Sequence, residues 1–428
     1  MEVLWDTKNG CFDKDFCYDG GMNYHNRFMP EPIGNNVPGT WAHDTITRRL
    51  ADIVRGVLAE NELEPEAIAG LEQLIAEIPE GEIRPLYDRT DWNHFITPFL
   101  GQNWLNVPYF FAETYFYRRI LEAIGYFVDE EFDPFADRKR QGLITTREAI
   151  RQLCRQVNEA LAQPSAEVLA PLLLADLWGN RADLSLFAAD LAEAKTMVDG
   201  GRERLLVDET PAVLDHLLDP SGFGTHSTTI TDSKPEGSER RIDFIMDNAG
   251  FELVCDLALA AYLLGSETAG TIHLHLKAHP TFVSDATKLD VAQTIPFLLS
   301  DGDSEVEAMA AQLKEWWDSG RLQLHDHPFW TSPLPMWEMP ADLHDELARS
   351  HLIIAKGDAN YRRLLGDRQW PFTTPFAAIV NYMPAPLLAL RALKSELAAG
   401  LSETQIAWLN GEDGQWLVNG RWGVIQFV

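Results

Sequence analysis

The chain has 428 residues, of which 46% are hydrophobic and 23% charged, as in an ordinary globular protein. Lys and Arg number 35 and Asp and Glu 65, which gives a net charge of −30. A surface this acidic repels nucleic acids and anionic membranes, so we expect neither as a partner. It also repels phosphorylated metabolites, so an enzyme that bound them would need a metal ion or clustered Lys and Arg at its site.

The length suggests two or three folding units, at about 100–200 residues per domain. Cys11, Cys17, Cys154 and Cys255 form neither a Cys-x-x-Cys pair nor a zinc-ribbon spacing, so we expect reduced thiols. The N-terminal residues lack a signal-peptide pattern, and no apolar run approaches the ~18–20 residues of a membrane span. We therefore expect a cytoplasmic protein. The sequence does not indicate its oligomeric state.

The first 200 residues are interpreted as a mainly helical domain. Apolar residues at helical spacing predict helices over 41–60, 64–78, 108–127 and 145–161. Pro65 suits the first turn of the second helix, and Pro79 ends it. The third helix is rich in aromatic residues and is expected to be mainly core. Within it, Glu113 and Arg118 are candidates for the wall of a cleft.

From about residue 205 the pattern changes, because short apolar runs alternate with helical stretches. The runs lie at 204–207, 242–246, 271–276, 322–325 and 352–354, with helical patterns at 252–264, 306–317 and 343–349. This alternation predicts an α/β unit with a mostly parallel sheet over residues 201–428. Residues 219–241 are interpreted as a long mobile excursion. Residues 416–424 contain Asn419-Gly420, a typical signal for a β-hairpin.

Polar residues follow several of the apolar runs, and ligands bind beyond the carboxyl ends of strands in such sheets. These residues are Asp247 and Asn248 after the second run, Lys277, Ser284 and Asp285 after the third, and Lys356, Asp358, Asn360, Arg362 and Arg363 after the fifth. Carboxylate and amide oxygens suit Mg²⁺ or Mn²⁺, and Lys and Arg neutralise phosphate charge. The pattern indicates an anion or metal site, although Asp-Asn after a strand is more often a capped turn.

Five long stretches carry a more specific signal, at 104–120, 242–261, 275–287, 356–370 and 384–394. In them the chain resembles the damage-control phosphatases, first catalogued as domain of unknown function 89. It is most similar to the branch whose members were also described as acidic-residue methyltransferases. The resemblance implies a helical N-terminal domain beside a Rossmann-like α/β/α sandwich. It also implies a divalent metal ion, Mn²⁺ or Mg²⁺, with Co²⁺ or Ni²⁺ as alternatives.

The resemblance also assigns site residues. By motif match, Asp247, Asn248 and Asp285 are the implied metal ligands and catalytic residues. The implied substrate-binding residues are Glu252, Asp358, Asn360, Tyr361, Arg362, Arg391 and Lys394. The branch carries an Arg-Thr-x-Lys motif, which here reads Arg391-Ala392-Leu393-Lys394, so the cation is kept and a hydroxyl contact is put in doubt. The spacing of Arg391 and Lys394 suggests one face of a helix.

The leading functional hypothesis is a metal-dependent phosphatase for small phosphorylated metabolites. The resemblance points to hexose phosphates, such as fructose 1-phosphate or fructose 6-phosphate, and to metabolite damage control. An Asp-x-Asp nucleophile motif is absent from the strand ends, which favours attack by metal-assisted water over an aspartyl nucleophile.

Three alternatives are less favoured. An S-adenosylmethionine-dependent protein carboxyl methyltransferase would need a Gly-x-Gly loop after the first strand, where residues 205–209 read Leu-Leu-Val-Asp-Glu. A non-catalytic sugar-phosphate-binding protein would not need the full ligand set. A zinc site lacks a His-Glu-x-x-His pattern. Its candidate ligands are His273, His275, His279, His325 and His327.

Overall fold

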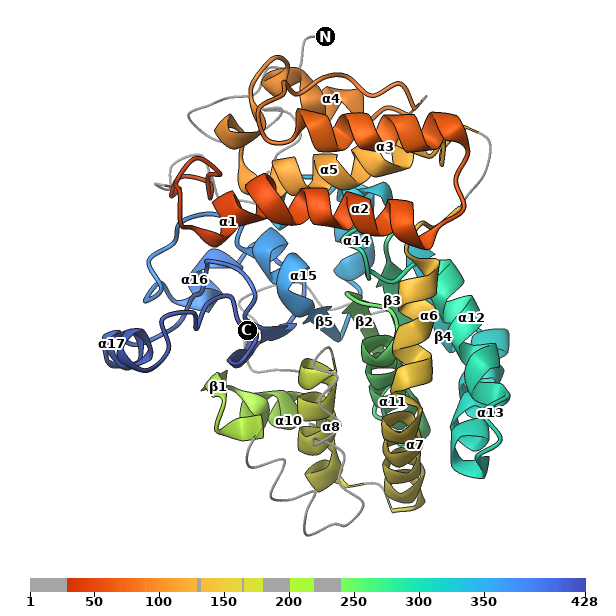
Figure 1. Ribbon diagram of the computed structural model, residues 1–428. Helices are drawn as coiled ribbons and strands as arrows, with labels where there is room; N and C mark the ends of the chain where they lie inside the picture. The colour runs from red at the N-terminus through yellow and green to blue at the C-terminus, as the bar shows by residue number, and fades with distance from the viewer. Residues whose placement is uncertain (1–28, 89, 129–131, 164, 180–200, 219–239) are drawn as a thin grey trace.

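The centre of the computed structural model is a seven-stranded sheet with helices on both faces (Figure 1). The structure describes all residues except 1–28, 89, 129–131, 164, 180–200 and 219–239. The strands lie in the order β1-β7-β6-β5-β2-β3-β4. Their bounds are β1 Leu205–Asp208, β2 Arg241–Ile245, β3 Thr271–Leu276, β4 Leu322–Asp326, β5 Leu352–Lys356, β6 Leu387–Ala392 and β7 Gly423–Phe427. The predicted α/β fold with a mostly parallel sheet is confirmed.

The order of the strands defines where a ligand can bind. Strands β6, β5, β2, β3 and β4 run parallel, whereas β7 is antiparallel to β6. From β2 the chain moves outward to β3 and β4, and it then returns to place β5 on the other side of β2. Such a reversal opens a crevice outside the carboxyl ends of the two central strands. The residues after β2 and β5 therefore have the favoured position for a site.

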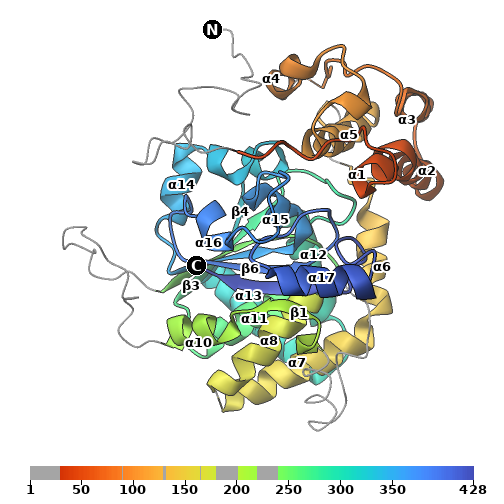
Figure 2. The ribbon, with the colours of Figure 1, turned by 90° about the vertical axis from the view of Figure 1, so that its left-hand side faces the viewer.

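The alternation of side chains along the strands divides the core into two layers. Ile242 and Phe244 of β2 point into one layer and Ile245 into the other. The first layer contains the helices that cover one face of the sheet (Figures 1 and 2). These are α7 Arg147–Ala162, α8 Ala166–Trp178, α10 Thr210–Leu218, α11 Phe251–Gly265, α12 Lys288–Leu299 and α13 Ser304–Ser319.

The opposite face carries the remaining C-terminal helices and, beyond them, the N-terminal helical layer (Figure 1). The C-terminal ones are α14 Ala341–Leu347, α15 Gly357–Leu364, α16 Phe376–Ile379 and α17 Glu403–Glu412, with 3₁₀ turns at Pro328–Thr331 and Met336–Glu338. The N-terminal ones are α1 Trp41–Asp44, a π-helical turn Thr45–Arg49, α2 Leu50–Glu60, α3 Pro65–Glu77, α4 Asn93–Ile96, 3₁₀ turns Thr97–Phe99 and Trp104–Asn106, and α5 Tyr109–Ala123. Helix α6 Ala136–Thr145 leads from these helices to α7, and its Leu143 packs in the first layer.

Most of the predicted helices are found close to their expected bounds. The segment predicted over 41–60 is helical throughout, with one π-helical turn, and Pro65 is the first residue of α3. Helices α7 and α8 precede residue 200, yet they pack against α11 on the face of the sheet. For example, the Tyr262 hydroxyl of α11 donates to the Ser165 carbonyl at the start of α8. The domain boundary near residue 200 stays a prediction.

Two local predictions near the C-terminus are wrong. Arg391 and Lys394 do not share a helix, because residues 387–392 form strand β6, buried between β5 and β7. Burial on both faces overrides the helix propensity of its Leu and Ala residues. The Asn419-Gly420 signal marks a turn, in which Gly420 has φ +69°, but no hairpin forms around it. Instead, β7 pairs with β6 and β1.

Two further expectations concern segments described only in part. The predicted excursion over 219–241 lies outside the described residues except for its last two positions. Cys154 and Cys255 are free and buried, whereas Cys11 and Cys17 lie outside the described part of the chain. None of the helices that the structure describes is both long enough and apolar enough to span a bilayer.

Candidate active site

Asp247 and Asn248 follow β2 at the point where the strand order reverses, which we call the switch point. Both residues are buried. The Asn248 amide donates to Asp247 Oδ2 at 2.8 Å and to Glu252 Oε2 at 2.9 Å. Glu252 lies in the first turn of α11, which begins after Gly250 at φ +71°. Asp247 Oδ1 has no hydrogen-bond partner among the described residues, although it is buried. An unpaired, buried carboxylate oxygen in such a place fits a metal ligand.

The segment after β3 brings Asp285 to the same point. Residues Asn248 and Asp285 form an isolated antiparallel bridge. The backbone N–H of Ala249 donates to the Ser284 carbonyl at 2.6 Å, and that of Ala286 donates to the Asp247 carbonyl at 2.7 Å. The three predicted ligands, Asp247, Asn248 and Asp285, are therefore held together by main-chain hydrogen bonds. Their role as ligands stays a prediction.

The loop before Asp285 is strained and packs against the N-terminal layer. Phe282 and Val283 have backbone φ angles of +48° and +69°, which residues other than glycine rarely adopt. The Phe282 ring packs against Tyr117 and Phe110 of α5, with centroids 5.2 and 6.2 Å away. Ser284 then donates its hydroxyl to Asn248 Oδ1 at 2.5 Å. Helix α5 thus supports the loop that orients Asn248.

The electrostatics of this cluster favour a cation. Burial and the neighbouring Glu252 carboxylate together raise the pKa of Asp247 to about 7. Burial also raises the pKa of Asp285 to about 7, against the charge of Lys277. The Glu252 pKa is raised by burial as well. Crowded, buried carboxylates with an amide oxygen beside them fit a hard divalent cation such as Mg²⁺ or Mn²⁺.

The strand β5 delivers a third side of the site. Gly357, the first residue of α15, has φ +79°, and a Cβ there would lie 1.8 Å from Asp247 Oδ2. Asp358 Oδ1 accepts from Arg391 Nε at 2.8 Å and from the Lys394 backbone N–H at 3.0 Å. Burial opposes ionisation of Asp358, but the charges of Arg391 and Arg362 outweigh it and lower its pKa. Asp358 therefore links the ends of β5 and β6.

Lys394 is the partly exposed end of this link. Arg391 is buried on β6 and holds the following loop, because its guanidinium donates to the carbonyls of Leu397 and Ser395 at 2.8 and 3.3 Å. Lys394 is only partly buried, and its charge acts on Asp247 and Glu252. Its ammonium makes no hydrogen bond or ion pair with any residue that the structure describes. It is therefore free to bind an anion.

The other predicted substrate residues on α15 are occupied by protein contacts. Asn360 donates to the carbonyls of Met246 and Lys356, both at 2.9 Å. Tyr361 donates to Gln426 Oε1 at 2.7 Å. The structure therefore brings Asp247, Asn248, Glu252, Asp285 and Lys394 together, while Asn360 and Tyr361 support the strands beneath them.

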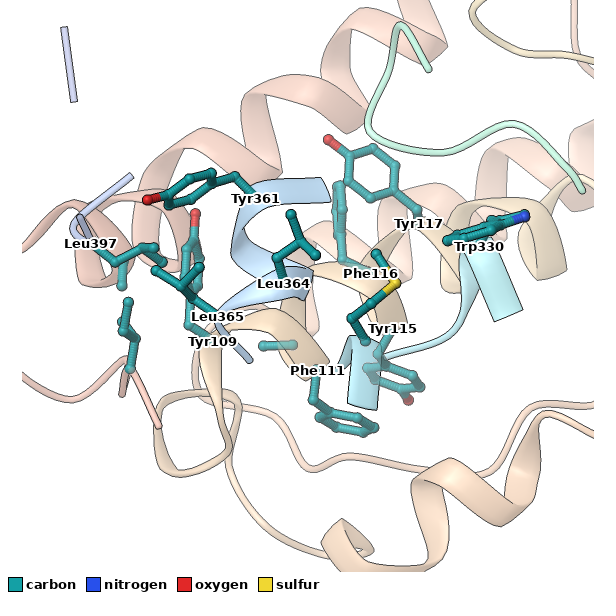
Figure 3. Close-up of a cluster of buried hydrophobic side chains, with 14 of the residues drawn as sticks. Tyr109, Phe111, Tyr115, Phe116, Tyr117, Trp330, Tyr361, Leu364, Leu365 and Leu397 are labelled. Carbon is teal, nitrogen blue, oxygen red and sulfur yellow. The ribbon is translucent and has the colours of Figure 1, made fainter. Parts of the chain in front are cut away.

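Arg362 forms an ion-pair network between α15 and α5. Its guanidinium lies 2.6 Å from Glu113 Oε2 and 2.8 Å from Asp367 Oδ1. Figure 3 shows how the side chains of α5, such as Tyr109 and Phe116, face those of α15. Arg118, the other α5 residue suggested for a cleft, is buried and paired with Asp88. The Arg362–Glu113 pair therefore joins α15 to the N-terminal helices.

The histidines form a separate group. His273 of β3 and His325 of β4 bond to each other through their rings at 2.9 Å, and His275 bonds to Asp243 at 2.7 Å. In the described part of the chain, no three His, Cys, Asp or Glu side chains are arranged to hold a metal ion. The cluster after β2 and β3 is not such a group of three, because one of its three predicted ligands, Asn248, is an amide.

Two residues at the site were noted in the sequence without a role. Lys277, directly after β3, forms an ion pair with Asp285 Oδ2 at 2.7 Å, and Ser284 binds Asn248. Lys277 stands at a strand end and Ser284 stands beside the motif residue Asp285. These positions were the only signal in the sequence that either residue belongs to the site. A third, Gly357, precedes the motif residue Asp358 and was not considered.

Comparison with known proteins identifies the family of the chain. Residues 45–407 match the model of the damage-control phosphatase ARMT1-like domain. The chain belongs to this family. Damage-control phosphatase ARMT1 of Danio rerio is 32% identical over 95% of this chain and 98% of its own length. The Mus musculus protein of that name is 35% identical over 86% of this chain and 87% of its own length. The Homo sapiens protein is 32% identical over 93% of this chain and 98% of its own length.

A solved structure is also similar in part. The crystal structure of a DUF89 family protein from Pyrococcus horikoshii covers 80% of this chain and 89% of its own, with 14% identity and a TM-score of 0.43.

Proposed function

We propose that this protein is a divalent-metal-dependent phosphomonoester hydrolase for small phosphorylated metabolites. The observation that carries the proposal is the cluster at the switch point, where Asp247, Asn248 and Asp285 meet and one buried carboxylate oxygen has no described partner. Beside it lies Lys394, whose ammonium is free of described partners. A metal site and a free cation together suit a phosphate group. Membership of a phosphatase family supports the same reaction class.

The residues take distinct roles in this proposal. Asp247, Asn248 and Asp285 would hold Mg²⁺ or Mn²⁺, with Co²⁺ or Ni²⁺ as further candidates, and the bound ion would supply Lewis acidity toward phosphate. Lys394 would neutralise phosphate charge. Glu252 lies in the same cluster and would orient water or a substrate hydroxyl.

A second group of residues would position Lys394 and α15. Asp358 and Arg391 hold the loop that carries Lys394, so they would act by fixing the position of its ammonium. Asn360, Tyr361 and Arg362 are bound within the protein and would orient α15. This division leaves few side chains for the rest of the substrate, which suits an enzyme with broad tolerance.

We propose hexose phosphates, such as fructose 1-phosphate or fructose 6-phosphate, as substrates of a cytoplasmic damage-control enzyme. The test is a phosphate-release screen of sugar phosphates, nucleotides and phosphopeptides with each of the four metals. Release from sugar phosphates that is lost with a chelator supports the proposal. Release confined to nucleotides or phosphopeptides would refute the substrate class. Methyl transfer from S-adenosylmethionine without any phosphate release would favour the methyltransferase alternative.

Two variants test the assigned residues. Asp247→Ala should abolish hydrolysis and leave the fold intact, because the residue lies in a loop outside the apolar core. Lys394→Met should raise KM and weaken inhibition by free phosphate. The matched control is Lys314→Met, which removes an exposed lysine of α13 that is paired with Asp318. Unchanged KM and phosphate inhibition in the Lys394 variant would place the phosphate elsewhere.

A further inference from the structure

Lys277 is a buried lysine that the proposed reaction does not use. It directly follows β3 and is 2% exposed. Its ammonium lies 2.7 Å from Asp285 Oδ2 and donates to the Met246 carbonyl at 3.1 Å. Lys277 therefore spans the ends of β2 and β3, directly behind the candidate ligands. Both of its described polar contacts are inside the protein, so it differs from Lys394, which is free to bind an anion.

The charge of Lys277 acts on two carboxylates at once. It opposes the rise in pKa of Asp285, to which it is bonded, and of Asp247. A buried ammonium is costly unless it is paired, and the carboxylates around it are equally costly without a cation. Lys277 thus supplies within the chain part of the positive charge that a divalent ion would supply.

The position of Asp285 does not depend on this side chain alone. The Lys277 backbone N–H donates to the Ala286 carbonyl at 2.9 Å, and Lys277 forms a parallel bridge with Thr287. The Ala286 N–H in turn donates to the Asp247 carbonyl. Removal of the ammonium would leave these main-chain bonds in place. The main effect of a neutral side chain at position 277 should therefore be electrostatic.

We propose that Lys277 is a resident counter-cation of the metal centre, which stabilises the metal-free fold and limits metal affinity. The inference rests on the metal site of the proposed function. With the ion absent, Lys277 balances Asp285 and Asp247. With the ion present, the two cations repel each other across the same carboxylates, so the ion is held less tightly and exchanges more readily.

The test compares Mn²⁺ binding and thermal unfolding of the full chain. Lys277→Met should lower Tm without metal and tighten Mn²⁺ binding, measured by titration calorimetry, by at least about tenfold. The rise in Tm with saturating Mn²⁺ should then exceed that of the wild type. Lys277→Gln keeps a donor for the Met246 carbonyl without the charge. It should show the same tightening, and it serves if the Met variant fails to fold.

The matched control is Lys356→Met. Lys356 is also a buried lysine at a strand end, but it is paired with Asp176 and Asp256, which are not candidate ligands. Its charge acts on Glu252, which is not a proposed metal ligand. This variant should have a lower Tm than the wild type, and its Mn²⁺ binding should not be tighter. Unchanged or weaker Mn²⁺ binding in both Lys277 variants would overturn the counter-cation role and leave the phosphatase proposal standing. Absence of Mn²⁺ binding to the wild type would overturn the metal site itself.

Discussion

Gly357 should be the least replaceable glycine at the site, and Gly357→Ala tests the geometry most directly. Its φ of +79° costs a residue with a side chain about 1–2 kcal/mol. In addition, the new Cβ would lie 1.8 Å from Asp247 Oδ2, where ordinary contact begins at 3.4 Å. Overpacking of this kind typically costs about 1–3 kcal/mol. We expect a total loss of about 2–5 kcal/mol in the free energy of unfolding.

The larger effect should be on metal binding. The Asp247 carboxylate would have to move by well over 1 Å, whereas metal–ligand distances tolerate only about 0.2 Å. Mn²⁺ affinity, measured by titration calorimetry, should fall by about tenfold to 100-fold.

The control is Gly320→Ala, because Gly320 has the same φ of +79° and open space around its Cβ position. The Gly320→Ala protein should lose only the free energy of unfolding that the positive φ costs, about 1–2 kcal/mol, measured by denaturant unfolding. It should bind Mn²⁺ like the wild type. Wild-type Mn²⁺ binding by Gly357→Ala would refute the placement of Asp247 in the metal site.

Two further outcomes are expected. Arg362→Met leaves Glu113 and Asp367 buried without their cation, which should cost about 3–5 kcal/mol in denaturant unfolding; a loss below about 1 kcal/mol would show that the network contributes little. Burial, helped by the charge of Arg118, lowers the pKa of His279 to about 3, so below about pH 6.5 the unfolded chain binds a proton that the folded protein does not. The wild type should therefore lose up to about 1.4 kcal/mol per pH unit between about pH 6.5 and 3 through this residue. Unfolding of His279→Gln at pH 7 and 5 should show a smaller loss, and an equal loss in both proteins would contradict the assignment.

The parts of the site that the sequence predicted share one property. Asp247, Asn248 and Asp285 follow apolar runs that are long enough to be recognised as strands, so the topology of a parallel sheet places them together. Strand β6 was missed because its Leu and Ala residues suit a buried helix equally well, and only its position between β5 and β7 decides.

Other features depend on partners distant in the chain. Arg362 was expected at the substrate, but Glu113, 249 positions earlier, binds its guanidinium. No local pattern indicates such a pairing. Likewise, the free ammonium of Lys394 results from the contacts of Asp358 and Arg391, which hold its backbone. The motifs therefore name the candidate residues, whereas the tertiary contacts show which of their side chains are already bound within the protein. Which of them bind a ligand stays a prediction.

The main-chain bonds between residues 247–249 and 284–286 have a consequence for how this site can change. Their spacing is set by backbone atoms, which every amino acid except proline supplies at these positions. A substitution of Asn248 by His would therefore exchange an oxygen donor for a nitrogen donor without moving the scaffold, and it would shift preference toward softer metals such as Ni²⁺ or Zn²⁺. In the proposed metal site, selectivity would therefore change with one side chain at a time.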